Sequence, residues 1–389
     1  MRSELRRAAI AGGLVFAVSG GTFGVWVGRI PEVQRRLDLS DGALGLTLLA
    51  LTAAAFVGIR AMPAVVARLG LRATVRASVI AFPATLFAAA VAVAGRSETG
   101  LVLALVAFGV TAGLLDGAMN VHGNAVEQRA GRSVINGLHA LFSIGALGGS
   151  AGVALLATQD VSAPASFGWG AVALIALGFA SWPDLLADGV AETPHHERRT
   201  NRPKRLVALL AAMCFVGFMT EGATADWSGV LLHRDRHAST ALAPLGYVAF
   251  NVTMSIGRFA GDHATDRWGR AGVVRTGALL AAASLAVAAL LPYPVPAALA
   301  FGVLGAGLSI IVPLMFGAAG DIDGDAHGAS VADVGSAGYV GIMVGPPLIG
   351  GLSELLGLSW ALVVPAVLLA GVALVAPRAV PSVPVQQQV

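Results

Sequence analysis

Twelve long apolar runs constrain this chain of 389 residues more than any other feature. A helix needs about 20 apolar residues to cross a membrane, and the runs have about that length. They are continuous rather than alternating, which argues against a transmembrane β-barrel. The sequence therefore predicts an all-α membrane protein with twelve transmembrane helices. The runs lie near 8–28, 43–66, 75–95, 100–123, 134–157, 168–183, 206–227, 241–261, 272–292, 296–319, 331–351 and 357–377.

The composition supports this class of protein. Only 12% of the residues are charged, whereas soluble domains carry roughly 25%. Cys214 is the only cysteine, which excludes a disulfide scaffold. The net charge of +3 comes from short basic clusters between apolar runs, so we expect a lipid bilayer as the environment and no nucleic acid as a partner.

The distribution of basic residues predicts the orientation. With both termini in the cytoplasm, seventeen of the 25 Lys and Arg residues lie on the cytoplasmic side and six outside. Cytoplasmic loops of membrane proteins carry an excess of Lys and Arg. We therefore expect a multi-pass protein of the cell (inner) membrane with cytoplasmic N and C termini.

Two halves of the chain resemble each other. A polar segment at 184–205 separates six spans in 1–183 from six spans in 206–389, and we expect it to be a cytoplasmic linker. Arg68, Gly70, Val75 and Arg76 recur at a constant offset as Arg267, Gly269, Val274 and Arg275. Gly145 and Gly149 on span five, and Gly341 and Gly345 on span eleven, have a spacing that permits close helix contact. Two six-helix halves around a site at the membrane midplane are typical of transporters.

The segment Gly261–Arg270 contains Asp266-Arg267-Trp268-Gly269-Arg270. It resembles the Asp-Arg-x-Gly-Arg signature of the major facilitator superfamily, and the resemblance covers nearly the whole chain. Asp116 with Asn120 on span four, and Phe142 to Ala146 on span five, resemble the fucose-permease-type branch of sugar:proton symporters. The carboxylate that this branch carries on span one is absent here. The resemblance implies that spans one, four, seven and ten line a central cavity.

Ionisable side chains inside spans are the candidates for proton coupling. They are costly in a membrane and usually functional. Asp116, Asn120 and Asn124 share one face of span four because they are spaced by four residues. Asp116 is the primary proton site that we expect, with His139 as a relay partner and Glu221 as the second candidate.

Amide, hydroxyl and aromatic groups inside spans suit a small neutral polar solute, and a sugar-like one is the leading hypothesis. Mid-span hydroxyls can also bond their own helix backbone, which is the alternative for each of them. The candidate substrate-binding residues are Trp26, Thr22, Asn120, Asn124, Thr224, Trp227, Tyr247 and Asn251.

Charged residues toward the predicted cytoplasmic side are candidate gates. We expect Arg258 to pair with Asp262 or Asp333, and Arg60 to pair with Glu127. Asp266 and Arg267 of the signature segment complete this group. Structural charge pairing and snorkelling to the interface are the alternatives to a gating role for the two arginines within spans.

These features predict a secondary active transporter. It would work by alternating access, in which one central site is exposed first to one side of the membrane and then to the other. No nucleotide motif, metal-ligand spacing or nucleophile–base pair is evident, so we expect no cofactor and no enzyme activity. We expect a monomer that couples a small-molecule substrate to protons by symport. Proton-coupled efflux of an amphipathic compound is the alternative, and a non-transporting membrane receptor is a more distant one.

Overall fold

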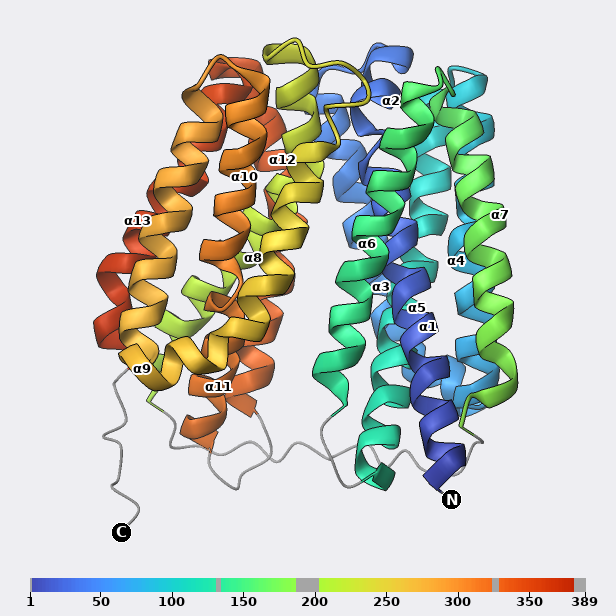
Figure 1. The fold of residues 1–389 in the computed structure, drawn as a ribbon, viewed down its shortest axis with the longest axis horizontal. Coiled ribbons are helices and arrows are strands. Elements are labelled where there is room, and N and C mark those ends of the chain that lie inside the picture. The colour runs from blue at the N-terminus through green and yellow to red at the C-terminus, as the bar shows by residue number, and fades with distance from the viewer. Residues whose placement is uncertain (1, 131–133, 187–202, 324–328, 381–389) are drawn as a thin grey trace.

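The computed structural model describes residues 2–130, 134–186, 203–323 and 329–380. These residues form helices joined by short connections (Figure 1). The first bundle contains α1 (Arg2–Val27), α2 (Ile30–Leu37), α3 (Asp41–Leu69), α4 (Leu71–Ala94), α5 (Glu98–Ala130), α6 (Ile135–Thr158), α7 (Ala163–Ser181) and the short η1 (Trp182–Asp184). The second contains α8 (Lys204–Val230), η2 (Leu231–Asp235), α9 (Leu245–Leu290), α10 (Pro294–Leu308), α11 (Ile311–Asp323), α12 (Ala329–Leu356) and α13 (Leu358–Ala379).

The two bundles stand side by side, with their long helices roughly parallel to one common axis (Figure 1). The start of α1 and the end of α13 lie at the same end of the molecule, at the bottom of the view. We call this the terminal end, and the other the opposite end. The short helix α2, which the apolar pattern did not predict, lies at the opposite end.

The helices account for the predicted crossings. Eleven segments within the described residues are long and apolar enough to span a membrane. α9 has non-helical backbone at Gly269, where φ is 71°, and so divides into two limbs. Its first limb runs along the bundle where the run at 241–261 predicted a span (Figure 1), although it is not counted among those eleven segments. Gly70, between α3 and α4, has a φ of 84°. Gly70 and Gly269, which correspond in the repeat, therefore both have a backbone conformation that residues with a Cβ rarely adopt.

Glycines set the same helix contacts in both bundles. A Cβ on Gly145 would lie 2.1 Å from the carbonyl oxygen of Ala17, which places α6 directly against α1. A Cβ on Gly341 would lie 2.4 Å from the carbonyl oxygen of Phe215, which places α12 directly against α8. The predicted small-residue spacings therefore do bring helix backbones together, as in other membrane bundles.

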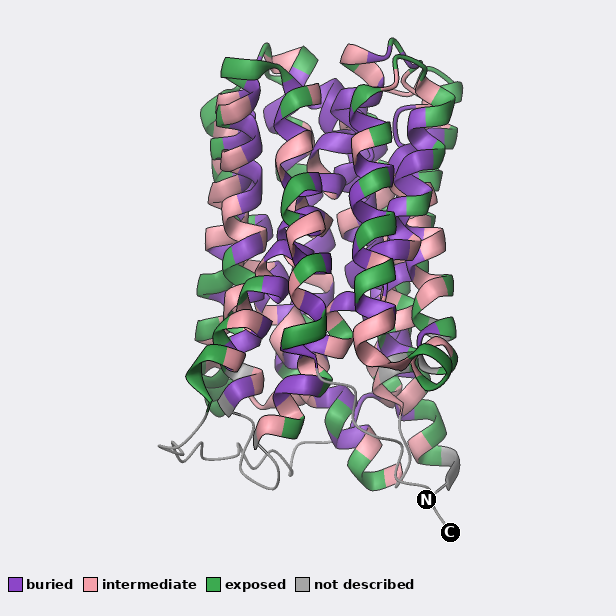
Figure 2. Ribbon diagram, turned by 90° about the vertical axis from the view of Figure 1, so that its left-hand side faces the viewer, coloured by how far each residue is buried: buried purple, intermediate pink, exposed green. Residues whose placement is uncertain are grey.

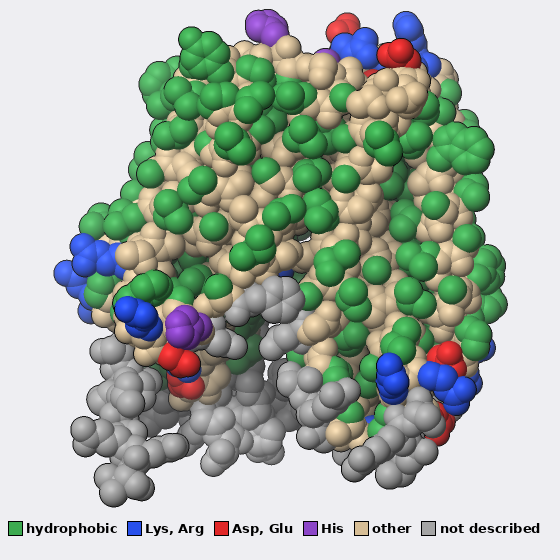
Figure 3. Space-filling model, viewed as in Figure 1, with side chains coloured by type: hydrophobic (Ala, Val, Ile, Leu, Met, Phe, Trp, Pro, Cys, Tyr) green, Lys and Arg blue, Asp and Glu red, His purple; other side chains and the backbone are tan. Residues whose placement is uncertain are grey.

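The outer surface is that of a membrane protein. Large apolar side chains are exposed along the bundle, with Leu355 at 81% and Val91 at 74%. Figure 3 shows mainly hydrophobic side chains over the middle of this face, with charged groups gathered toward the two ends. Figure 2 shows that the buried residues line the inside of the bundle. An apolar surface of this extent is typical of a helix bundle that lipid surrounds.

The two bundles meet through α3 against α12 and α6 against α9. Close contacts lie at the opposite end, where Gly45 approaches Pro346 and Gly229 approaches Pro31. Toward the terminal end the surface is hollowed between the bundles (Figure 3). The bundles are therefore joined more closely at the opposite end than at the terminal end.

Candidate functional site

A chain of polar side chains begins on α5 of the first bundle. The amide nitrogen Nδ2 of Asn120 donates to the backbone oxygen of Asp116 at 2.8 Å and to its Oδ1 atom at 3.3 Å. His139 on α6 lies with Nε2 at 3.1 Å from Oδ1 of Asn120. An amide oxygen only accepts hydrogen bonds, so this geometry requires a proton on Nε2 of His139. The predicted proton site and its predicted relay partner are therefore linked through Asn120.

Tyr339 carries this chain into the second bundle. It lies on α12, and its hydroxyl donates to Oδ2 of Asp116 at 3.4 Å. Its ring stacks on Phe218 of α8, with centroids 6.4 Å apart and planes at 13°. The phenol is thus oriented by its own bundle while its hydroxyl contacts the other. Sequence reasoning missed Tyr339, because no regular sequence spacing relates a tyrosine on span eleven to a carboxylate on span four, 223 residues away.

A second group of charges faces the first from α8 and α9. Nη2 of Arg258 lies 3.9 Å from Oε1 of Glu221, and the two side chains are 36% and 34% exposed. Arg258 is also close enough to His139 for its charge to act on the imidazole. Because both partners are partly exposed, the ion pair is weak by comparison with a buried one. Glu221 and His139, predicted separately, thus both face Arg258.

Other predicted substrate ligands bond their own helices. The hydroxyl of Thr22 donates to the carbonyl oxygen of Val18 at 2.8 Å, and that of Thr224 donates to Thr220 at 2.8 Å. Nδ2 of Asn251 donates to the carbonyl oxygen of Tyr247 at 2.9 Å. These are the backbone contacts that polar residues in helices commonly make. Solute binding by these groups stays a prediction.

The two predicted tryptophans are buried. Trp26 is 1% exposed and stacks on Phe167 of α7, with ring centroids 5.8 Å apart. Trp227 is fully buried on α8. Neither indole N–H has a hydrogen-bond partner among the described residues. Asn124, two turns beyond Asp116, is exposed toward the terminal end of α5. In this conformation the Trp26 ring packs within the first bundle.

The predicted gating residues are spread over the terminal end. Arg60 lies over the ring of Phe56, 5.9 Å from its centroid, and Arg267 lies 6.0 Å from the centroid of Trp268. Oε2 of Glu127 accepts the backbone N–H groups of Val134 and Ile135 at the start of α6. The pairing of Arg60 with Glu127, and that of Arg258 with Asp262 or Asp333, stay predictions. Asp266 and Asp333 are exposed, and the side chain of Asp262 lies outside the described residues.

A buried carboxylate joins the bundles at the opposite end. Asp41, 7% exposed at the start of α3, accepts at Oδ1 from Nε2 of Gln34 at 2.6 Å and from Arg234 of the second bundle at 2.5 Å. Its Oδ2 atom accepts from the hydroxyl of Ser353 on α12. The next residue, Gly42, donates its N–H to Glu354 at 2.8 Å.

We call Asp41, Gln34, Arg234, Ser353 and Glu354 the latch. In sequence, Asp41 reads as an acidic residue in the first turn of a helix, where it complements the helix dipole. Arg234 and Ser353 belong to the other half and reach Asp41 only when the chain is folded. No sequence spacing could have identified these partners.

A second buried ion pair orders the opposite end of the first bundle. Arg29, 1% exposed, donates to Glu32 at 2.9 Å and to the carbonyl oxygen of Val161 at 2.8 Å. Glu32 in turn accepts the N–H of Ala163 at the start of α7. Burial lowers the pKa of Arg29, and the neighbouring Glu32 carboxylate opposes that effect. This pair ties α2 to the start of α7.

Comparison with known proteins decides the family. An uncharacterized MFS-type transporter of Yersinia pestis is 32% identical over 92% of this chain and 92% of its own length. Residues 206–388 also match the family model of the Major Facilitator Superfamily. The chain belongs to the major facilitator superfamily. It is therefore a secondary transporter and a multi-pass membrane protein, and it is not an enzyme.

Further matches agree with this family. The membrane protein MosC of Rhizobium meliloti is 28% identical over 89% of this chain and 84% of its own. The structure of a D-xylose-proton symporter superposes with a TM-score of 0.75 at 13% identity, over 97% of this chain and 98% of that one. The structure of the nucleoside transporter NupG superposes with a TM-score of 0.71 at 16% identity, over 97% of this chain and 98% of that one. Likeness at this level of identity shows the major facilitator fold and nothing of the substrate.

Proposed function

We propose that the transporter moves a small polar, sugar-like solute across the cell membrane together with protons. Residues 1–183 and 206–389 would act as two rocking halves joined by the linker at 184–205, with the termini in the cytoplasm. The hollow toward the terminal end would then face the cytoplasm. The contact between Asp116 and Tyr339 is the observation that carries this proposal, because it places an ionisable group on the boundary between the halves.

Protonation of Asp116 would change how the halves hold each other. An ionised carboxylate accepts the hydroxyl of Tyr339 in a charge-assisted hydrogen bond, which is about twice as strong as a neutral one. A proton on Asp116 weakens this contact and reduces the cost of burying the group. His139, bonded to Asn120, and Glu221, beside Arg258, are the groups through which a proton could reach or leave that carboxyl.

The surrounding side chains support a neutral, hydroxylated solute. Asn120, His139 and Tyr339 offer donors and acceptors on the boundary between the halves, and Phe218 provides an aromatic surface beside them. A sugar or polyol presents alternating hydroxyl groups and an apolar face, which such a set of groups can bind. The monomer suffices for this mechanism, since both halves come from one chain.

Transport by reconstituted protein tests the proposal. We expect proteoliposomes with an inward proton gradient to accumulate one or more compounds from a panel of sugars, polyols and amphipathic drugs. Asp116→Asn keeps the size and polarity of the side chain but cannot carry a proton. We expect it to abolish gradient-driven accumulation while preserving exchange of labelled for unlabelled solute across the membrane.

Glu98→Gln serves as the matched control, because Glu98 lies at the other end of the same helix α5. It should accumulate solute as the wild type does. An Asp116→Asn protein with wild-type accumulation and pH dependence would remove Asp116 from the mechanism and make Glu221 the first candidate. Proton-driven extrusion of a drug from the panel would instead establish efflux.

A further inference from the structure

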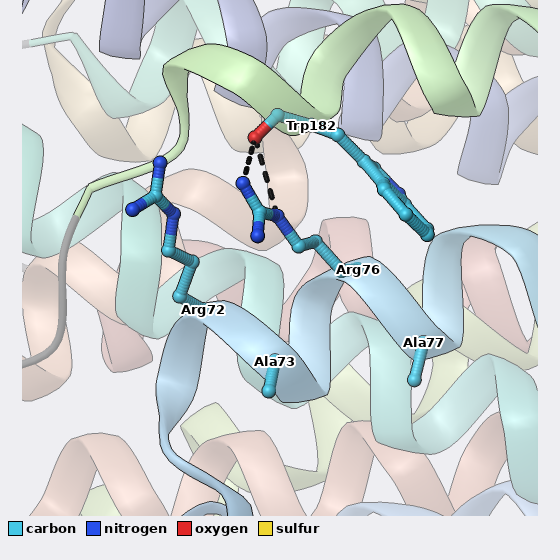
Figure 4. A pocket seen from close by; sticks show the side chains of 5 residues that line it. All are labelled: Arg72, Ala73, Arg76, Ala77 and Trp182. Carbon is cyan, nitrogen blue, oxygen red and sulfur yellow. Dashed lines mark hydrogen bonds between the residues drawn. The ribbon is translucent and has the colours of Figure 1, made fainter.

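A cavity of about 390 Å³ lies on the first bundle, away from the boundary between the halves. It is lined by Arg72, Ala73, Arg76 and Ala77 from the first two turns of α4, and by Trp182 of η1. Figure 4 shows both guanidinium groups directed toward the segment that contains Trp182. Figure 1 places α4 and α7 at the outer edge of their bundle. The pocket is thus remote from the Asp116 site.

Backbone carbonyl groups hold the two arginines in place. Arg76 donates through Nε at 3.2 Å and through Nη2 at 2.6 Å to the carbonyl oxygen of Trp182, and its guanidinium lies 5.7 Å from the centroid of the indole ring. Arg72 donates through Nη2 to the carbonyl oxygen of Pro183 at 3.0 Å. Fixed guanidinium groups bind oxyanions well because little side-chain freedom is lost on binding.

The Arg76 side chain has N–H groups beyond those that bond Trp182. A guanidinium has five N–H groups, and two of those on Arg76 bond Trp182. The nearest acidic residue in sequence to Trp182 is Asp184, which pairs with Arg7 at 3.6 Å. Among the described residues, no carboxylate forms an ion pair with Arg76. Its charge is therefore not neutralised by the parts of the protein that the structure describes.

The pocket lies at the ends of two candidate membrane spans. Arg72 and Arg76 are at the start of one candidate span, Leu71–Ala94, and Trp182 is at the end of another, Ala163–Asp184. Phe179, 48% exposed, contacts Trp182 edge-to-face at 4.8 Å between ring centroids. Trp is enriched at membrane interfaces, and Phe179 lies one turn further into the candidate span. The side chains thus change from cationic to aromatic along the span, and this order complements a phospholipid, whose anionic phosphate is followed by apolar acyl chains.

We propose that this pocket binds an anionic phospholipid, with its phosphate at Arg72 and Arg76 and its acyl chain along Phe179. The methyl side chains of Ala73 and Ala77 leave the space that a glycerol backbone needs. Basic pockets at the ends of transmembrane helices are known to hold acidic headgroups. A bidentate contact from Arg76 to the phosphate supplies the specificity that a diffuse surface charge lacks.

Native mass spectrometry of the delipidated full chain tests this proposal. The titrants are phosphatidylglycerol, phosphatidylcholine and inorganic phosphate. We expect phosphatidylglycerol to bind more tightly than phosphatidylcholine, and Arg76→Gln to weaken its binding by at least about fivefold. Ala77→Phe fills the cavity but keeps both arginines, and it should weaken binding similarly. This second variant covers the case in which Arg76→Gln loosens η1.

Arg205→Gln is the matched control, because Arg205 is exposed at the start of α8 and lies outside the pocket. Its affinity for phosphatidylglycerol should equal that of the wild type. Equal binding of both lipids, or wild-type affinity in both pocket variants, would overturn the proposal. Displacement of the lipid by inorganic phosphate at equal concentration would also overturn it, since the pocket would then be a site for soluble phosphate.

Discussion

The latch and the Asp116 site both join the two halves, but they do so in different ways. Asp41 in the latch is 7% exposed and accepts hydrogen bonds from Gln34, Arg234 and Ser353. At the Asp116 site, the contact to Tyr339 is 3.4 Å long and the ion pair of Arg258 is 3.9 Å long and partly exposed. Short hydrogen bonds to a buried carboxylate hold a conformation, whereas long contacts between partly exposed side chains can exchange a solute or a proton at little cost.

This difference places closure and coupling in separate parts of the molecule. The latch closes the opposite end and carries no group that we expect to exchange protons during transport. The Asp116 site lies where the halves separate toward the terminal end. Variants at buried and at partly exposed polar contacts test whether burial decides how much each contact stabilises the fold.

Arg29→Met should have the largest effect on stability. It leaves the buried carboxylate of Glu32 without its cation, which typically costs about 3 to 5 kcal/mol. Chemical denaturation in detergent measures the loss. Arg35→Met, on the neighbouring and exposed side chain, should change the free energy of unfolding by less than about 0.5 kcal/mol. Equal losses in the two variants would show that burial is not what makes the Arg29 pair important.

Asp41→Ala should have an intermediate effect. It leaves the buried donors of Gln34 and Ser353 without their acceptor, while Arg234 is partly exposed and keeps Asp235 as a partner. We expect a total loss of about 2 to 3 kcal/mol. Glu354→Gln is the comparison within the latch, because Glu354 is exposed and its contact to Gly42 is at the surface. A loss in Glu354→Gln as large as that in Asp41→Ala would contradict the assignment of the latch to its buried carboxylate.

Arg258→Gln should have the smallest effect on stability and a clear effect on transport. Partly exposed ion pairs contribute about 0 to 1 kcal/mol, so the unfolding curve should barely move. Uptake should fall several-fold, because the variant removes the cation that faces both Glu221 and His139. Arg275→Gln, on the second limb of α9, provides the control for uptake. A large loss of stability with normal uptake would reverse the roles that we assign to the two regions.

The sequence predicts the parts of this account that depend on local spacing. Apolar runs predicted the crossings, and the four-residue spacing of Asp116 and Asn120 predicted the contact that the structure shows between them. Tyr339 and Arg234 could not be found in this way, because their partners lie 223 and 193 residues away. Hydrophobic periodicity describes which face of a helix is buried, but it does not specify which polar groups meet across a boundary between two halves.

The distance between the halves at each end reports whether the latch holds the opposite end closed. Two pairs of spin labels in a Cys214→Ala background would report it: Arg35→Cys with Ser239→Cys at the opposite end, and Arg129→Cys with Arg267→Cys at the terminal end. All four positions are exposed. We expect Asp41→Asn to lengthen the first distance and shorten the second, because releasing the latch lets the halves rock. Two unchanged distances, or two that lengthen together, would contradict it.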